Sequence, residues 1–340
     1  MTEGRRFDVI DLARGIALAA MAFYHFTWDL AWYGVVEPTT PFTTPMRVAS
    51  HTIGATFLAL AGVSLGFAHA RGWNGRAFAR RLLLIGGAAA LVTGASLAVA
   101  PQAPIGFGIL HCIFVGSLLT APFLMARRGE IVDADPRPPP TPTRIAALDA
   151  GAYSRTGASV ALALGLLLII FPAFVSSPRF DPPWLVWLGL GAQEPSTLDW
   201  RPIMPWGGVL LIGFALARLA PLPFSGWRAE AAPSRALAFA GRHSLAIYLI
   251  HQPLLIGLLW SVVNFSGMAE RQSVEVYLKA CRPACVEAGG EIAACDLACA
   301  CVVKDASSAG LAGRLGAHAL SSDERGRIGA IVQSCGSRSR

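Results

Sequence analysis

Long apolar segments alternate with short polar connections along most of the chain. A hydrocarbon core about 30 Å thick requires roughly 20 mostly apolar residues in each crossing helix. Seven segments meet this requirement, of which the sixth is the shortest: 9–33, 48–69, 78–100, 106–126, 156–175, 203–219 and 239–265. The pattern therefore predicts an all-α fold, a polytopic bundle of about seven transmembrane helices.

Arginine collects in every second connection of this pattern. The connections after the second, fourth and sixth segments are basic, whereas three others carry few positive charges: 34–47, 101–105 and 176–202. Short loops rich in Lys and Arg stay on the cytoplasmic side of a membrane. We therefore expect the N-terminus, with Arg5 and Arg6, to lie inside, and everything after residue 266 to lie outside.

The composition agrees with a membrane protein. Of 340 residues, 54% are hydrophobic and 14% are charged, and the mean hydropathy is +0.51. The formal net charge of +7 does not indicate a nucleic-acid partner, because the arginines lie in short loops and form no single basic face. The first apolar run continues past any signal-peptide cleavage point. We expect lipid as a partner, the inner cell membrane as the location, and an uncleaved first span.

Six of the seven cysteines follow residue 280. Two C-x3-C pairs flank Gly289 and Gly290, and residues four apart share one face of a helix. Two short antiparallel helices turning at the glycines would be joined by nested bridges, with a third bridge beyond them: Cys281–Cys299, Cys285–Cys295 and Cys301–Cys335. A zinc site is the alternative, but the spacing and the predicted oxidising side favour disulfides and no metal.

Three parts follow from these patterns. Residues 1–265 form a membrane domain, and residues 127–155 form a proline-rich cytoplasmic loop within it. Residues 266–340 form a small Cys-rich helical tail on the outer side.

Four ionisable residues share one stripe of the first apolar segment. At 100° per residue, Asp11 and Asp29 are five whole turns apart, and Arg14 and His25 lie within roughly 60° of that line. A charged group at the bilayer centre costs about 2.5 kcal/mol or more. The stripe should therefore face the bundle interior or a water-filled cavity.

The spacing within the stripe predicts roles. Asp29 follows His25 by four residues, so that it could fix the imidazole tautomer and make His25 a general base. Arg14 lies about 16 Å nearer the cytoplasm and could hold an anionic donor, with Asp11 pairing with it or positioning it. The alternative is that these groups merely satisfy one another, as buried polar networks do.

Four further residues are weaker candidates. His51 opens the second segment and could reach the same cavity. His111 follows two glycines near the outer end of the fourth, and it either binds substrate or bonds to a neighbouring helix. Asp199 is a candidate for positioning a substrate or for capping a helix. His251 lies in the seventh segment, before a proline. Cys112 has the context of a buried inert thiol.

Four motifs occur in a fixed order: Asp11-Leu-Ala-Arg14-Gly15 with Tyr24-His25, Phe107 to His111, Asp199 to Trp206, and His243 to Pro253. Together they resemble the bacterial relatives of heparan-alpha-glucosaminide N-acetyltransferase, within the transmembrane acyltransferase superfamily, over roughly residues 5–265. The wider superfamily is also similar in having an arginine followed eleven residues later by a histidine, here Arg14 and His25.

The resemblance implies an acetyltransferase. Acetyl-CoA would bind from the cytoplasm near Asp11 and Arg14, and the acetyl group would pass to an amine or hydroxyl of a glycan outside. His25 would be the transfer residue or base. The eukaryotic enzyme is thought to use a histidine in the loop after this helix, for which His51 is the nearest substitute here. The alternative function is a proton-coupled transporter or flippase that uses the stripe as a relay. Neither reading predicts an oligomeric state.

Overall fold

The structure is a computed structural model that describes residues 7–69, 73–125, 144–220, 226–316 and 320–338. It divides into two compact units, one of residues 1–24 with 44–251 and one of residues 25–43 with 252–340. Within the described residues every regular element is helical and none is a strand. The predicted all-α class is confirmed.

Eight helices form the apolar part of the chain: α1 (Asp8–Trp32), α2 (Thr44–Ala68), α3 (Gly75–Val99), α4 (Ile109–Met125), α5 (Arg144–Ile170), α6 (Ile203–Leu219), α7 (Ala232–Arg242) and α8 (Ser244–Phe265). By length and composition, α1, α2, α3, α8 and the segment Arg155–Ala173 are able to cross a membrane, whereas α4 and α6 are apolar but shorter. The chain is therefore a membrane protein with five candidate spans among its described residues. Helices α1 and α8 each contribute to both units.

Several predicted boundaries differ from the structure, and two of them concern the last span and the proline-rich loop. The last expected span, 239–265, is interrupted at His243, where the amphipathic helix α7 ends and α8 begins. Near this break α7 closely approaches α1, because Gly241 leaves no room for a side chain beside the backbone of Asp11. Helix α5 begins at Arg144, so the last part of the expected loop 127–155 is helical. Residues 126–143, Arg5 and Arg6 lie outside the described residues.

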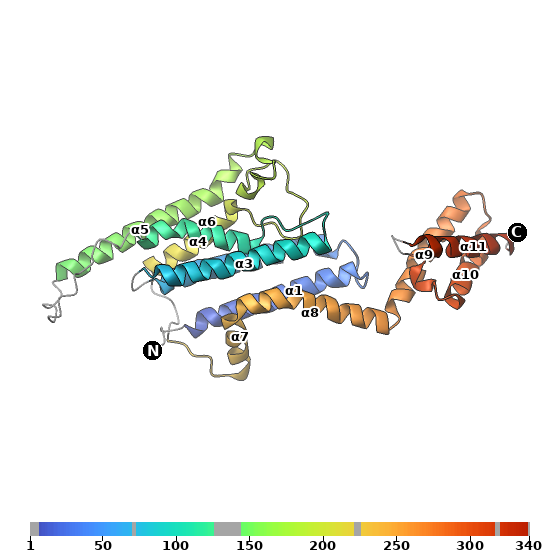
Figure 1. Cartoon of the computed structure of the whole chain (residues 1–340), viewed down its shortest axis with the longest axis horizontal. Coiled ribbons are helices and arrows are strands. Elements are labelled where there is room, and N and C mark those ends of the chain that lie inside the picture. The colour runs from blue at the N-terminus through green and yellow to red at the C-terminus, as the bar shows by residue number, and fades with distance from the viewer. Residues whose placement is uncertain (1–6, 70–72, 126–143, 221–225, 317–319, 339–340) are drawn as a thin grey trace. The chain divides into compact units, whose positions relative to one another are not determined.

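Helix α6 is the centre of the first unit. It contacts α2, α4 and α5, and Figure 1 shows α4 and α6 between α3 and α5. Small residues allow the closest approaches: a Cβ at Gly62 of α2 would overlap the backbone of Leu210, and one at Gly208 would overlap the backbone of Gly165. Backbones that approach so closely gain van der Waals packing, which drives helix association in lipid.

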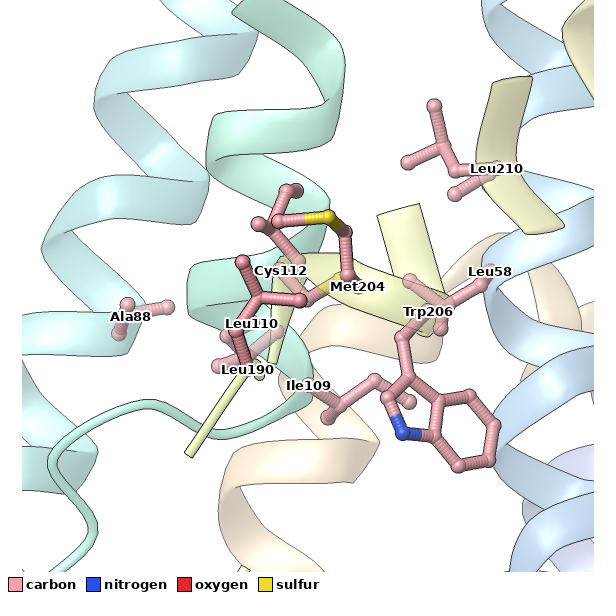
Figure 2. Packing of buried hydrophobic residues seen from close by; sticks show 12 residues of the cluster. Leu58, Ala88, Ile109, Leu110, Cys112, Leu190, Met204, Trp206 and Leu210 are labelled. Atoms are coloured by element: carbon pink, nitrogen blue, oxygen red, sulfur yellow. The ribbon is translucent and has the colours of Figure 1, made fainter. Parts of the chain in front are cut away.

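The main core cluster lies where α2, α3, α4 and α6 converge (Figure 2). Leu58 and Leu210 are fully buried, and Trp206 and Ile109 are nearly so. Cys112 belongs to this cluster and is a buried free thiol, as its context predicts. The core therefore fixes the starts of α4 and α6 against α2, which is where several candidate residues lie.

The second unit contains the end of α1, the later part of α8 and the tail. Its tail helices are α9 (Met268–Glu287), α10 (Ile292–Ser308) and α11 (Ser322–Arg338), drawn in orange to red in Figure 1. Three disulfides join them in the pairing that the spacing favours: Cys281–Cys299, Cys285–Cys295 and Cys301–Cys335. The sequence predicted two helices around the glycine turn, and α11 is a third one that the last disulfide attaches to α10.

Charged pairs support this tail. Asp305 lies beside the Cys301–Cys335 bridge and pairs with Arg338 at 3.2 Å. Sulfurs bonded to each other are not thiolates, so these three residues do not offer a metal the usual ligands. Arg314 pairs with Glu324 at 2.8 Å, and the backbone N–H of Ser321 also donates to Glu324. The hydrogen bond from Arg314, followed by that from Ser321, lowers the pKa of Glu324 to about 2.

Candidate functional site

Two clusters of polar residues occupy the first unit, one toward each end of α2. The first, the Arg14 cluster, consists of Asp11, Arg14, Ser64 and Arg81. The Arg14 guanidinium lies 3.6 Å from the Asp11 carboxylate, one turn earlier on α1. It also donates to the hydroxyl of Ser64 on α2, and that hydroxyl donates in turn to the carbonyl of Leu60 at 2.6 Å. Helix α1 therefore presents Arg14 to the last turns of α2.

Arg81 of α3 reaches the same turn of α2. Its Nη2 donates to the carbonyl of Ala61 at 3.1 Å, three residues before Ser64, and its positive charge is close enough to that of Arg14 to interact electrostatically with it. Among the described residues no carboxylate lies within ion-pair distance of Arg81. The cluster therefore contains two guanidinium groups and one carboxylate, with an excess of positive charge.

The second, the His51 cluster, consists of Ser50, His51, Arg201 and Trp206. Arg201, just before α6, donates from Nη2 to the Ser50 hydroxyl at 2.6 Å, and its guanidinium carbon lies 4.7 Å from the centroid of the Trp206 ring. Gly54 makes room for it, because a Cβ there would lie 2.9 Å from Nε. These contacts hold the start of α6 against the start of α2.

His51 is exposed and lies beside Trp206, with 5.4 Å between the ring centroids. Its Nδ1 is 2.7 Å from the carbonyl oxygen of Arg47, which only accepts hydrogen bonds. Nδ1 therefore carries the proton, and in the neutral ring Nε2 keeps its lone pair. Among the described residues Nε2 has no hydrogen-bond partner. This is the tautomer and exposure that a general base requires.

Asp199 and His111 are engaged by the backbone beside this cluster. Asp199 accepts from the N–H of Ile109 at 2.8 Å, and thus caps the start of α4. His111 accepts from the N–H of Gly108 at Nδ1, and its Nε2 lies 3.2 Å from the hydroxyl of Thr93. The bonding partner that was expected on a neighbouring helix is therefore Thr93 of α3.

The remaining predicted residues lie elsewhere. In the second unit Asp29 is buried, and its Oδ1 accepts from Nε2 of Gln252 at 2.7 Å. The partner that the spacing predicted was His25, and Gln252 on α8 takes its place because α8 packs on this turn of α1. Oδ2 of Asp29 has no partner among the described residues. His251, in the first unit, donates from Nδ1 to the carbonyl of its own helix at Tyr248, 2.7 Å away.

The structure thus divides the predicted stripe between the two units. Asp11 and Arg14 lie in the first unit with His51, His111, Asp199 and His251, whereas His25 and Asp29 lie in the second. Arg14 and Asp11 are brought together with partners from α2, and His51 with partners from the segment before α6.

Sequence reasoning gave no role to Ser50, Ser64, Arg81, Arg201 or Gln252. Two signals were available. Arg201 lies in a connection expected to face outward, where arginine is uncommon and therefore informative. Arg81 follows the buried Phe78 by three residues and so shares its inward face, whereas the neighbouring Arg80 is exposed. The serine positions carry no such signal.

The Arg14 cluster lies on three helices and has an excess of positive charge among the described residues, and the His51 cluster joins α2 to the segment before α6. The model of the family "Heparan-alpha-glucosaminide N-acetyltransferase, catalytic" matches residues 6–133 and 144–253, which include both clusters. The chain belongs to this family of membrane acetyltransferases. No curated protein and no solved structure matches it.

Proposed function

We propose that the chain transfers an acetyl group from cytoplasmic acetyl-CoA to an amine or hydroxyl of an extracytoplasmic glycan. The observation that carries the proposal is the pair of polar clusters at the two ends of α2. His51 and Ser64 are thirteen residues apart, which corresponds to about 20 Å along a helix. Donor phosphates at one end and an acceptor at the other would be linked by the long thioester arm of the donor.

The proposed topology has seven crossings, with the Arg14 cluster toward the cytoplasm of the inner cell membrane. It is supported by the arginine-rich connections at that side. It is also supported by the contact of Phe7, at the start of α1, with Phe67, at the end of α2, whose rings are 5.1 Å apart. In this topology residues 1–265 are the membrane domain. The tail of residues 266–340 faces the outside, where disulfides persist.

Arg14 is the proposed donor-binding residue, and Asp11 holds it in place. A guanidinium binds phosphate oxygens through a planar fork of N–H donors. The hydrogen bond to Ser64 uses Nη2 and the Asp11 pair lies at Nη1, so the side chain is already oriented before a donor arrives. Such preorganisation lowers the entropic cost of binding.

His51 is the proposed general base. Its Nε2 would take the proton from the acceptor amine or hydroxyl as that nucleophile attacks the acetyl carbonyl carbon. The carbon–sulfur bond then breaks, CoA leaves as a thiolate, and the proton passes from His51 to that sulfur. The adjacent Arg201 charge favours the negative oxygen that develops on the acetyl group.

His25 and Asp29 are the second proposed catalytic pair, with His25 as base or acetyl carrier. The buried Asp29 oxygen without a described partner supports a functional group on this turn of α1. Asp29 accepts a hydrogen bond from Gln252, which weighs against Asp29 as the residue that orients His25. We therefore rank His51 first.

Asp199, His111 and His251 are proposed to shape the acceptor site. Asp199 and His111 fix the segment that enters α4, and His251 lies one turn from the partly buried Tyr248 of the same core cluster. They would affect substrate binding by holding the backbone around the acceptor site in place.

The test is acetylation of cell-envelope glycans, measured by mass spectrometry in cells with wild-type protein, H51A or H25A. The proposal predicts acetyl groups on one glycan that disappear with H51A. If the acetyl groups remain in H51A and disappear in H25A, the catalytic base is His25 on α1. Glycans unchanged in every strain, together with proton-gradient-dependent transport, would instead support the transporter alternative.

A further inference from the structure

The Arg14 cluster contains a cation that has no counter-ion among the residues that the structure describes. Arg81 is partly buried within the third apolar helix, and its one hydrogen bond within the described part of the chain goes to the carbonyl of Ala61. A guanidinium has five N–H donors, and a charge taken from water is costly unless it is paired. The remaining N–H donors of Arg81 have no partner among the described residues.

A second positive charge lies beside the first. Arg14 and Arg81 approach the same turn of α2, through Ser64 and Ala61 respectively, and their charges repel each other. Asp11 is the one carboxylate within ion-pair distance of either guanidinium among the described residues, and it lies 3.6 Å from Arg14. An added anion would remove the repulsion and pair the second guanidinium.

The position of this pair suits a ligand that enters from one end of the bundle. Arg14 lies six residues after the start of α1, Arg81 six after the start of α3, and Ser64 four before the end of α2. All three are therefore within about 9 Å of helix ends that meet at one side. An anionic group would reach them without crossing the apolar core.

We propose that Arg81 is a second donor-binding residue and that, together with Arg14, it forms a two-arginine clamp on a phosphate group. This inference rests on the proposed function, because it assigns the phosphate to the acetyl donor. A phosphate group carries enough acceptor oxygens for two guanidinium forks. The headgroup of an anionic phospholipid offers the same chemistry, and the experiment separates the two sources.

The experiment measures binding of three probes to the full chain in phosphatidylcholine nanodiscs by calorimetry. CoA carries all phosphates, dephospho-CoA lacks the 3′-phosphate, and pantetheine has none. The variant is R81Q, and the matched control is R80Q, which removes the same charge from the exposed neighbouring position. We expect R81Q to weaken CoA binding about tenfold or more, and R80Q to leave it unchanged. Pantetheine should bind weakly and equally to all three proteins.

The variant R81K keeps the charge and should fall between wild type and R81Q, which separates charge loss from misfolding. Equal CoA affinity in R81Q and R80Q would overturn the clamp while leaving the proposed function intact. Wild-type protein that binds pantetheine as tightly as CoA would overturn the clamp without any mutant. Wild-type protein that binds no CoA would overturn the donor half of the proposed function as well.

The second arm replaces part of the phosphatidylcholine with phosphatidylglycerol. If the two arginines bind the donor, phosphatidylglycerol should change the melting temperature of the wild type and that of R81Q by the same amount. If phosphatidylglycerol stabilises the wild type, R81Q abolishes that gain and CoA has no effect, the phosphate belongs to a lipid headgroup and the assignment to the donor is overturned.

Discussion

Arginine side chains from other elements contact both ends of α2, but their hydrogen-bond partners differ. At the Ser64 end, Asp11 pairs with Arg14, whereas Arg81 pairs with no carboxylate among the described residues and donates to the carbonyl of Ala61. At the Ser50 end, Arg201 donates to the carbonyl of Trp200, the carbonyl and hydroxyl of Ser50, and stacks on Trp206. The first arrangement has an excess of positive charge among the described residues, and the second holds the start of α6 against the start of α2. The comparison supports the proposed division of roles, with ligand binding by arginine at one end and catalysis by histidine at the other.

The largest expected effect is at the His51 end. Replacing His51 with Ala should lower kcat for acetyl transfer by about 100- to 10,000-fold, because general base catalysis contributes that much. Affinity for CoA should stay unchanged, since His51 is about 20 Å from Ser64 along α2. Steady-state kinetics together with CoA binding measure both quantities.

The matched control for this substitution is H243A, which removes another exposed histidine. We expect it to keep wild-type kcat. Should H51A keep its rate while H25A loses it, the division of roles between the two ends of α2 is wrong.

The next effect is at the Ser64 end. Replacing Arg14 with Gln should raise the KM for acetyl-CoA about 10- to 100-fold, because a charged hydrogen bond to phosphate is lost. The turnover at saturating donor should change much less. A lower kcat with an unchanged KM would show that Arg14 acts on the reacting group and does not act as an anchor.

A smaller effect concerns the framework of the His51 end. Replacing Asp199 with Ala should destabilise the protein by about 1 kcal/mol, the usual value of a helix cap. Asn at this position keeps an acceptor oxygen for the N–H of Ile109 and should preserve most of the stability. Thermal unfolding measures both variants. If Asn abolishes transfer at unchanged stability, Asp199 itself contacts the substrate.

The smallest expected effect concerns the stability of the tail in acid. Glu324 in the tail has a pKa lowered to about 2 by Arg314 and Ser321, from an ordinary value of 4.5. A lowered carboxyl pKa contributes stability that is complete above 4.5 and is lost as the pH falls toward 2. Tail unfolding followed by circular dichroism should therefore respond to acid in this range, and E324Q should reduce that response. An unchanged acid response in E324Q would contradict this assignment.

The helices follow from the sequence because their apolar length is local information. The expected segment 203–219 coincides with α6, and the expected start of α1 differs from the observed one by a single residue. The break at His243 was missed, because the apolar run continues through it from α7 into α8. The tail pairing follows from helical spacing. The helix α11 was missed although Ile328, Ile331, Val332 and Cys335 recur at helical spacing, because its segment is short and otherwise polar.

The candidate site was less predictable for the same reason. The spacing of Asp11 and Arg14 within one helix indicates their ion pair, which the structure contains. The spacing of His25 and Asp29 is equally regular, but Gln252 from α8 supplies the hydrogen bond to Asp29. Spacing shows which residues of one helix are able to pair, but it does not show whether a residue from another helix takes the partner's place, as Gln252 does at Asp29.

The most direct test of the central claim is a sided transfer assay. Purified protein is reconstituted in liposomes with labelled acetyl-CoA on one side and an amino sugar on the other. Proteoliposomes with H51A serve as the control. The proposed function predicts acetylated sugar on the side opposite the donor with wild-type protein, and a loss of at least about 100-fold with H51A. Product formed only when donor and sugar share one side, or none at all, would contradict it.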